Sequence, residues 1–457
     1  MARSPNDRLA DLVETAGLSR KALARAVKEV AAADGTRLAT DHTLVGKWLD
    51  GMVPRGQTPE YIARVLSARL GRTITRADIG MGAKSGTVPA ESLTFATDDD
   101  DSTKTITALW TADVEQLGDL RTATVEPLAW REASLRWLIG GRGRPPESGG
   151  TYRRVGLGEV EAIRLTVEHF AELDNRFGGG HGRQALIHYL DTDVAPLLHA
   201  NLTEPVRLAL FAAVAEATLL AAWSCYDSGL HGLAQRYFIQ ALRLAQTGND
   251  RRLAGSILSA MSHQATFLGH YQDAADLARA ALAGVAQVGT ATMRAQFHAM
   301  EARALARLGS NRACDLAMSD AVRHFDRSLP DDDPVWISYF NEAELAAEMG
   351  HCMRDLGRPS GVAQHLSLEV AQGDGSYVRS DFFATMVLAD AHAAAGQAEE
   401  AVRVARLALD LGAQLKSARC TSYVAEFRNR LEALGPSTAV RELAEEAADH
   451  PLWTPAR

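Results

Sequence analysis

Glycine recurs along the second half of the chain at a nearly constant spacing. Successive positions are separated by 40, 40, 48, 39 and 39 residues, and they are Gly229, Gly269, Gly309, Gly357, Gly396 and Gly435. Periods in this range are typical of helical-hairpin arrays, in which each repeat stacks on its neighbours. We therefore expect an all-α protein whose larger part is a repeat array.

Small residues follow these glycines in a fixed register. Alanine stands five and twelve positions after three of them, as Ala234 and Ala241, Ala274 and Ala281, and Ala401 and Ala408. The repeat at Gly309 has Cys314 and Ala321 there, and the repeat at Gly357 departs with Val362 and Glu369. The pattern predicts that each glycine ends the first helix of a hairpin in the left-handed conformation, and that the small residues let the second helix pack closely.

The charge is divided unevenly along the chain. The 457 residues hold 48 Lys and Arg and 57 Asp and Glu, a net charge of −9. Residues 1–82 hold 13 and 9 of these, a net of +4, which leaves 35 and 48, a net of −13, for residues 83–457. An acidic chain is not expected to coat nucleic acid along its whole length, but one basic module is compatible with these numbers.

Composition also divides the chain into domains. Residues 83–107 are rich in Ser, Thr, Gly and Asp and include four consecutive aspartates at 98–101. Such a segment cannot bury enough apolar surface to fold by itself, so we expect a flexible acidic linker there. This predicts a helical domain over 1–82, the linker over 83–107, and a helical repeat domain over 108–457.

Residues 1–82 have the apolar pattern of short helices. Ser19 is placed to cap a helix with a 3.6-residue apolar period, and Thr40 or Asp41 to cap a shorter helix whose Trp48 faces inward. Thr58 and the proline after it are typical of a helix start. The outward positions of the third helix are expected to be Asp41, His42, Thr43, Gly46 and Lys47.

A capped helix followed by a polar-faced helix is typical of a helix-turn-helix DNA-binding unit. The stretch Trp48-Leu49-Asp50-Gly51-Met52-Val53-Pro54 resembles the end of the recognition helix in the Xre/Cro type, although the connection from Val30 to Thr40 is longer than the usual tight turn. The resemblance implies base contacts from the third helix and phosphate contacts from cations around it. The predicted DNA-binding residues are Arg20, Lys21, Arg25, Thr40, His42, Thr43, Lys47 and Arg55.

The repeats carry a second resemblance. The sequence Gly269-His270-Tyr271-Gln272-Asp273-Ala274 resembles a tetratricopeptide hairpin with a slightly longer period. A helix-turn-helix head before such an array is similar to the peptide-responsive bacterial regulators called RRNPP. Residues 171–181, 188–190 and 231–238 resemble a family of actinobacterial helix-turn-helix and tetratricopeptide regulators of development and secondary metabolism. The resemblance implies a cytoplasmic transcription regulator and specifies no ligand.

The first helix of each tetratricopeptide repeat normally lines the concave surface of the superhelix. Its polar and aromatic residues are therefore candidates for holding a ligand, either a peptide or a small molecule. The predicted ligand-binding residues are His263, Gln264, Phe267, Arg294, Phe297, His298, Glu301, Asn341 and Phe382. The alternative is that such residues pack adjacent repeats, and we expect this of about half of them.

Other features point to no further chemistry. The sequence has no His-Glu-x-x-His, Gly-x-Ser-x-Gly or Walker motif, so we expect neither an enzyme nor a cofactor. His181 and His188 invite a metal site, but capping and core roles are favoured. The four consecutive residues Arg142-Gly143-Arg144-Pro145 match a minor-groove hook, but an exposed loop is favoured. Residues 208–226 carry a single charge, Glu216, and we expect a buried helix rather than a membrane span.

These expectations combine into one hypothesis. The chain is predicted to be a transcription regulator whose head binds a double-stranded DNA operator and whose repeat body forms a homodimer and senses an effector. The alternative is a scaffold whose helical head binds a partner protein. The sequence leaves open the operator, the sign of regulation and the identity or existence of an effector.

Overall fold

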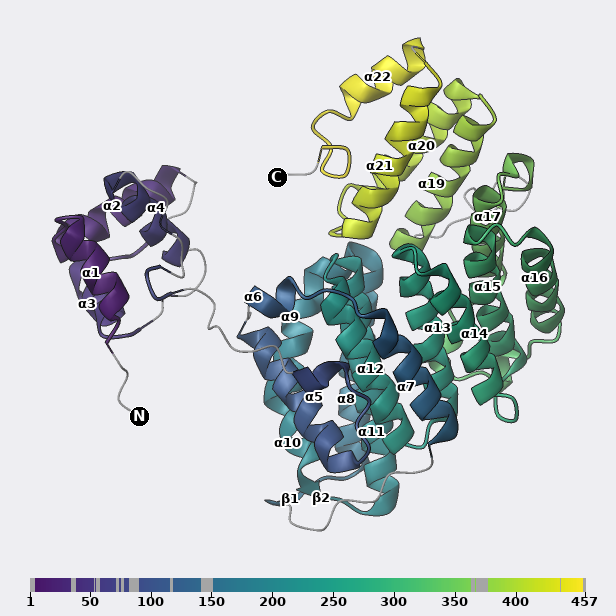
Figure 1. The fold of residues 1–457 in the computed structure, drawn as a ribbon, viewed down its shortest axis with the longest axis horizontal. Coiled ribbons are helices and arrows are strands. Elements are labelled where there is room, and N and C mark those ends of the chain that lie inside the picture. The colour runs from purple at the N-terminus through teal and green to yellow at the C-terminus, as the bar shows by residue number, and fades with distance from the viewer. Residues whose placement is uncertain are drawn as a thin grey trace. The chain divides into compact units, whose positions relative to one another are not determined.

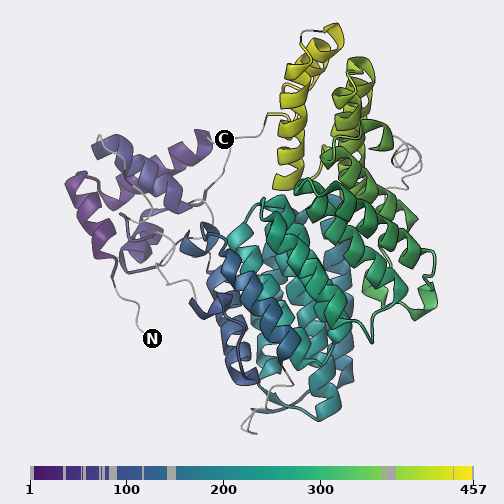
Figure 2. The ribbon, with the colours of Figure 1, turned by 45° about the vertical axis from the view of Figure 1, so that its right-hand side comes forward.

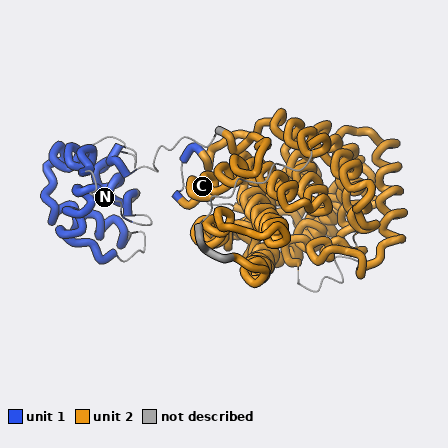
Figure 3. Tube along the Cα trace, turned by 90° about the horizontal axis from the view of Figure 1, so that it is seen from below, with its two compact units in different colours: residues 1–87, 115–119 blue, residues 88–114, 120–457 orange. Residues whose placement is uncertain are grey.

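The computed structural model of the chain describes residues 5–33, 38–52, 54, 58–70, 74, 78–81, 90–115, 118–140, 151–362, 366, 377–435 and 437–454. Strands in these ranges are limited to β1 (Thr151–Arg154) and β2 (Ala200–Asn201), which pair in parallel. The chain forms two compact units, residues 1–87 with 115–119 and residues 88–114 with 120–457 (Figure 3). The predicted all-α fold, with an N-terminal helical domain and a solenoid-like array, is confirmed.

Unit 1 contains four helices around one apolar core. They are α1 (Asp7–Thr15), α2 (Arg20–Ala33), α3 (His42–Leu49) and α4 (Thr58–Leu70). The predicted helix starts are confirmed at Ser19, whose hydroxyl accepts from the backbone N–H of Ala22, and at Asp41, which caps α3. Buried side chains from all four helices, including Leu9, Val27, Trp48 and Ile62, form the core.

Unit 2 begins with helices that precede the repeats. They are η1 (Ala90–Leu93), α5 (Asp99–Val114), α6 (Gly118–Arg121), α7 (Pro127–Ile139), α8 (Leu157–Phe177), α9 (Gly179–Tyr189), the π-helical turn η2 (Leu190–Val194) and α10 (Ala195–Leu198). The short helix α6 is divided between the units: Gly118 and Asp119 belong to unit 1, and the rest of the helix belongs to unit 2. Helix α7 packs on α12 and α14 of the array through its buried tryptophans Trp130 and Trp137.

The array itself consists of helical hairpins that lie side by side (Figure 1 and Figure 2). The pairs are α11 (Glu204–Asp227) with α12 (His231–Thr247), α13 (Arg251–Phe267) with α14 (Tyr271–Gly284), α15 (Ala291–Arg307) with α16 (Asn311–Phe325), α19 (Val378–Ala394) with α20 (Ala398–Gly412), and α21 (Ala418–Ala433) with α22 (Thr438–Glu446). Helix α17 (Glu342–Asp355) is the first helix of a further repeat, and the turns η3 (Pro330–Asp332) and η4 (Val335–Ile337) precede it.

The glycine register predicted these hairpins correctly. All six glycines have a positive φ, between 68° and 87°, and each follows the first helix of its repeat. The residues five and twelve positions after the first five glycines are fully buried wherever they are described, including Cys314 and Val362, whereas Val440 in the last repeat is partly buried. Glu369 lies outside the described residues. The period therefore results from one left-handed residue and one close helix contact in each repeat.

The predicted flexible linker is wrong over residues 99–107. Asp98 caps α5 by accepting from the backbone N–H of Asp101 at 2.8 Å. Asp99 is buried, and its carboxylate accepts from Arg207 at 3.0 Å and from Arg243 at 2.8 Å. The aspartates thus begin a helix, where their charge is favoured by the helix dipole, and two arginines from the array neutralise the buried one.

Helix α11 is the one described helix that is long and apolar enough, by length and composition, to cross a membrane. It is packed against α8, α9 and α12 inside unit 2, and 67% of its most apolar stretch is buried there. Glu216 forms an ion pair with Arg164 of α8 at 3.4 Å. The expectation of a buried core helix is confirmed.

Candidate nucleic-acid interface and repeat interior

Helix α3 of unit 1 has one buried and one exposed face. Val45, Gly46 and Trp48 are buried, whereas His42, Thr43 and Lys47 are exposed. Asp41 fixes the start of the helix because its carboxylate accepts from the backbone N–H of Leu44 at 2.9 Å, which lowers the pKa of Asp41. The exposed face therefore presents an imidazole, a hydroxyl and an ammonium group.

Helix α2 brings cations next to this face. Arg20, Lys21 and Arg25 are exposed, and Arg25 lies 3.6 Å from Glu29 in a surface ion pair. A Cβ atom placed on Gly46 would lie only 3.3 Å from Nη1 of Arg20. The Arg20 guanidinium thus rests on α3, one residue away from Lys47.

Three of the predictions for unit 1 need comment. Thr40 is buried, so a contact between its side chain and a base is not supported, and Asp41 rather than Thr40 is the capping residue. Gly46 was expected to face outward, but it is buried. The Arg20 side chain of α2 lies against it. Arg55 and the segment 142–145 lie outside the described residues.

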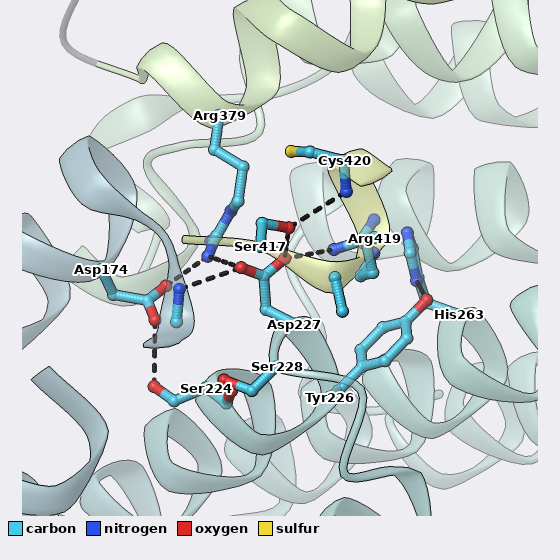
Figure 4. Close-up of polar contacts among 12 residues, drawn as sticks. Asp174, Ser224, Tyr226, Asp227, Ser228, His263, Arg379, Ser417, Arg419 and Cys420 are labelled. Carbon is cyan, nitrogen blue, oxygen red and sulfur yellow. Dashed lines mark hydrogen bonds and ion pairs between the residues drawn. The ribbon is translucent and has the colours of Figure 1, made fainter. Parts of the chain in front are cut away.

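The first helices of the repeats hold a buried ion network where the array meets α8 and α9 (Figure 4). Asp227 at the end of α11 accepts hydrogen bonds from the backbone N–H of Gly179 and from the hydroxyl of Ser417, both at 2.9 Å. Arg379 of α19 and Arg419 of α21 lie 3.6 and 3.7 Å from the same carboxylate. One aspartate therefore joins four segments of the chain.

Asp174 of α8 is the second carboxylate of this network. It accepts from Nη1 of Arg379 at 2.6 Å and from the hydroxyl of Ser224 at 2.9 Å. Burial raises the pKa of Asp174, while Arg379 opposes that shift. Arg379 thus connects α8 to a helix more than two hundred residues later.

The glycine run 178–180 allows the backbones to meet at this junction. The N–H of Lys416 donates to the carbonyl of Phe177 at 2.8 Å, and the N–H of Gly180 donates to the carbonyl of Lys416 at 3.1 Å. A Cβ atom on Gly179 would lie 2.7 Å from the carbonyl oxygen of Ser224. The run serves close packing. In the described residues no group of three or more His, Cys, Asp or Glu side chains is arranged to hold a metal ion.

His263 of α13 lies between a tyrosine and an arginine. Its Nδ1 is 3.0 Å from the hydroxyl of Tyr226, and its Nε2 is 3.4 Å from Nη1 of Arg303. Burial and the nearby arginines hold the pKa of His263 well below its usual value, so the ring is neutral. Because a guanidinium only donates, a neutral ring satisfies both contacts when Nε2 accepts from Arg303 and Nδ1 donates to Tyr226.

Aromatic rings surround the other interior charges. The guanidinium of Arg419 lies 4.5 Å from the ring centroid of Phe383 and 4.7 Å from that of Tyr226. His351 of α17 contacts Tyr423 edge to face, and burial lowers its pKa well below the usual value. Interior polar groups are therefore held both by ion pairs and by aromatic faces.

The predicted ligand-binding residues divide into three groups. His263 and Phe267 lie in this interior, where Phe267 contacts Tyr226. Gln264, Phe297 and Phe382 are fully buried, and Oε1 of Gln264 has no hydrogen-bond partner among the described residues. Gln264 donates to the backbone carbonyl of His231 at 3.0 Å.

The remaining four predicted residues contact neighbouring structure outside this interior. Arg294 donates to the carbonyl of Ala286 at 2.7 Å, and Glu301 accepts from Arg279 of α14 at 2.7 Å. His298 stacks on His324 of α16. Asn341 caps α17, since its side chain accepts from the N–H of Glu344 at 3.0 Å. The face of α15 that we predicted to be concave is turned towards α14 and α16, while Arg303 faces the interior.

Sequence reasoning missed most of the interior charges, although a signal for them exists. The residue six positions before each repeat glycine is polar or aromatic, and these residues are Trp223, His263, Arg303, His351, Asp390 and Asn429. His263, Arg303 and His351 of this set lie in the interior described above. Counting backwards from the glycine would have found Arg303 and His351, but not Asp227, Arg379 or Arg419, which stand at other positions of their repeats.

Comparison with known proteins adds one match. Residues 9–82 match the family described as SP15 N-terminal domain, and this match lies within unit 1 and includes none of the repeats. No curated protein matches the chain.

Proposed function

We propose that this protein is a transcription regulator whose unit 1 binds an operator in double-stranded DNA. The observation that carries the proposal is the exposed face of α3, where His42, Thr43 and Lys47 stand opposite a fully apolar inner face. A helix with such a face, preceded by a second helix of the same small core, has the form of a recognition helix. Imidazole, hydroxyl and ammonium groups are all able to contact base edges or phosphates.

The cations of α2 support the same proposal. Arg20 lies over α3, and Lys21 and Arg25 are exposed on the same helix. Phosphate contacts from such residues position a recognition helix in the groove. The net charge of +4 over residues 1–82 is modest, so tight binding requires two heads, and the proposal includes a homodimer.

Unit 2 is proposed to hold the two heads and to sense a peptide or a small molecule. Its interior contains buried polar atoms with no hydrogen-bond partner among the described residues, including Nε of Arg303, Nε of Arg419 and Nδ1 of His351. Unpaired buried polar groups are costly, and a bound effector would satisfy them. A protein with these parts acts in the cytoplasm, on the nucleoid.

Selection of bound duplexes from a random pool, followed by fluorescence anisotropy at fixed salt, tests the DNA-binding proposal. We expect Lys47→Ala and Arg20→Ala each to weaken binding of the selected duplex about tenfold, with the salt slope reduced by roughly one unit for each lost phosphate contact. Arg69→Ala is the matched control, because Arg69 is an exposed cation on α4, outside the α2–α3 pair. No selected duplex, or equal affinities for all four proteins, would favour a scaffold that binds a partner protein.

A further inference from the structure

Helix α7 has an apolar stripe on its outer side. Its inner residues, Trp130 and Trp137, are buried against the array, whereas Leu128, Leu135 and Ile139 are 73%, 57% and 76% exposed. These three are spaced by seven and four residues, so they lie along one side of the helix. An exposed stripe of three large aliphatic side chains on one helix is typical of an interaction surface.

The ten residues that follow Gly140 in the sequence are poor in apolar side chains. Residues 141–150 read Gly-Arg-Gly-Arg-Pro-Pro-Glu-Ser-Gly-Gly and contain no aliphatic or aromatic side chain other than the two prolines. Together with Glu132, the three aliphatic residues are spaced by four, three and four positions. This is the spacing of the inward-facing residues in a coiled coil. A second helix with the same spacing would therefore fit the stripe.

The charges along the stripe favour an identical partner. Glu132 lies between the exposed leucines and is 2.8 Å from Arg136 of the same helix, whereas Arg131 is paired with Asp273 of α14. In an antiparallel pair related by a two-fold axis, Leu128 of one copy lies opposite Ile139 of the other, and Glu132 lies opposite Leu135. Each glutamate then lies next to Arg136 of the other copy, so this pair of charges is complementary across the two-fold axis.

We propose that α7 is the self-association surface of this protein and that its partner is the α7 of a second copy. Apolar contacts of Leu128, Leu135 and Ile139 form the centre of the contact, and Glu132 with Arg136 sets its antiparallel direction. The biological use of the contact rests on the proposed function, which requires two heads, but the contact forms without DNA.

Sedimentation velocity of the full chain, over protein concentrations from nanomolar to tens of micromolar and without DNA, tests this proposal. We expect the wild type to form a dimer and Leu135→Glu to raise its dissociation constant at least a hundredfold. Glu132→Arg is expected to raise it about tenfold, and this effect should shrink at high salt. The matched control is Leu316→Glu on α16, because Leu316 is 61% exposed yet lies on another helix, and its dimer should match the wild type. Circular dichroism checks that all four proteins are folded.

Three outcomes would overturn the proposal. They are a wild type that stays monomeric throughout, a dimer that survives Leu135→Glu, and an equal loss of the dimer in Leu316→Glu. A monomeric wild type that still selects a DNA duplex would leave the DNA-binding proposal standing. A dimer lost in Leu135→Glu, in a protein that selects no duplex, would support the α7 contact and refute DNA binding.

Discussion

Helix α3 of unit 1 and the first helices of the repeats carry similar polar residues in opposite ways. His42, Thr43 and Lys47 are exposed on α3, with the apolar residues of that helix forming the core. Arg303, His351 and Arg419 are buried in unit 2, among ion pairs and aromatic rings. A polar residue on a helix therefore indicates contact with another molecule only when the fold leaves its side chain exposed. In the repeats, the same residue types form contacts between helices of the chain itself.

The largest expected effect comes from breaking the buried network of the repeats. Arg379→Met leaves the carboxylates of Asp174 and Asp227 without their shared cation, and removing one partner of a buried ion pair costs about 3–5 kcal/mol of unfolding free energy. Urea unfolding followed by circular dichroism measures this loss. The control is Arg403→Met, which removes an exposed pair with Glu400 and should cost less than about 1 kcal/mol. Equal losses would mean that the network does not hold α8 to α19.

The next effect concerns the close backbone contact beside that network. In Gly179→Ala the new methyl group meets the carbonyl oxygen of Ser224 at 2.7 Å, so we expect a loss of about 1–3 kcal/mol in the free energy of unfolding. Gly158→Ala is the matched control on α8, where nothing lies within 4 Å of the new atom. That helix should gain up to about 1 kcal/mol from the alanine. Opposite signs in the same urea assay are the prediction, and a neutral Gly179→Ala would contradict it.

A smaller effect is expected from the buried histidines of the repeats. The pKa of His351 is well below that of an unfolded chain, near 6.5, so on acidification the unfolded state takes up a proton that the folded state does not. Stability is therefore present above pH 6.5 and is lost as the pH falls, by about 0.8 kcal/mol per such histidine between pH 7.5 and 6. Burial raises the pKa of Asp390 to about 6, so this carboxyl stabilises the folded state by about 0.4 kcal/mol over the same range, a contribution that wild type and variant share.

Urea unfolding of His351→Gln over this range measures the histidine contribution. We expect the variant to lose less stability than the wild type on going from pH 7.5 to 6, by about 0.8 kcal/mol. His169→Gln is the control, because it replaces an exposed histidine of α8 rather than a buried one. Parallel curves for wild type and His351→Gln would show that His351 is not held neutral.

The sequence predicted the parts of the fold that depend on local rules. The six glycines and the buried residues that follow them required only the left-handed conformation and close packing of adjacent helices. Ser19 and Asp41 likewise cap the helices that follow them. These features depend on residues a few positions apart, so a local pattern is enough to find them.

The sequence did not predict features that depend on distant partners. Asp99 stands in a segment whose composition is typical of a linker. It is nevertheless a buried helix residue, because Arg207 and Arg243, more than a hundred residues later, neutralise its carboxylate. In the same way, we predicted Glu301 of α15 to face the interior, but Arg303 does. Which of the two faces inward depends on the helices that pack on each side of α15. Composition cannot supply either partner.

Hydrogen–deuterium exchange of the full chain, with and without a saturating amount of the selected DNA duplex, tests the central comparison most directly. The account predicts slower exchange in residues 20–25 and 42–49 on DNA binding, and no change in the buried first helices α13 and α15. Unchanged exchange in α3, or protection confined to unit 2, would contradict the assignment of the exposed polar face of α3 to DNA.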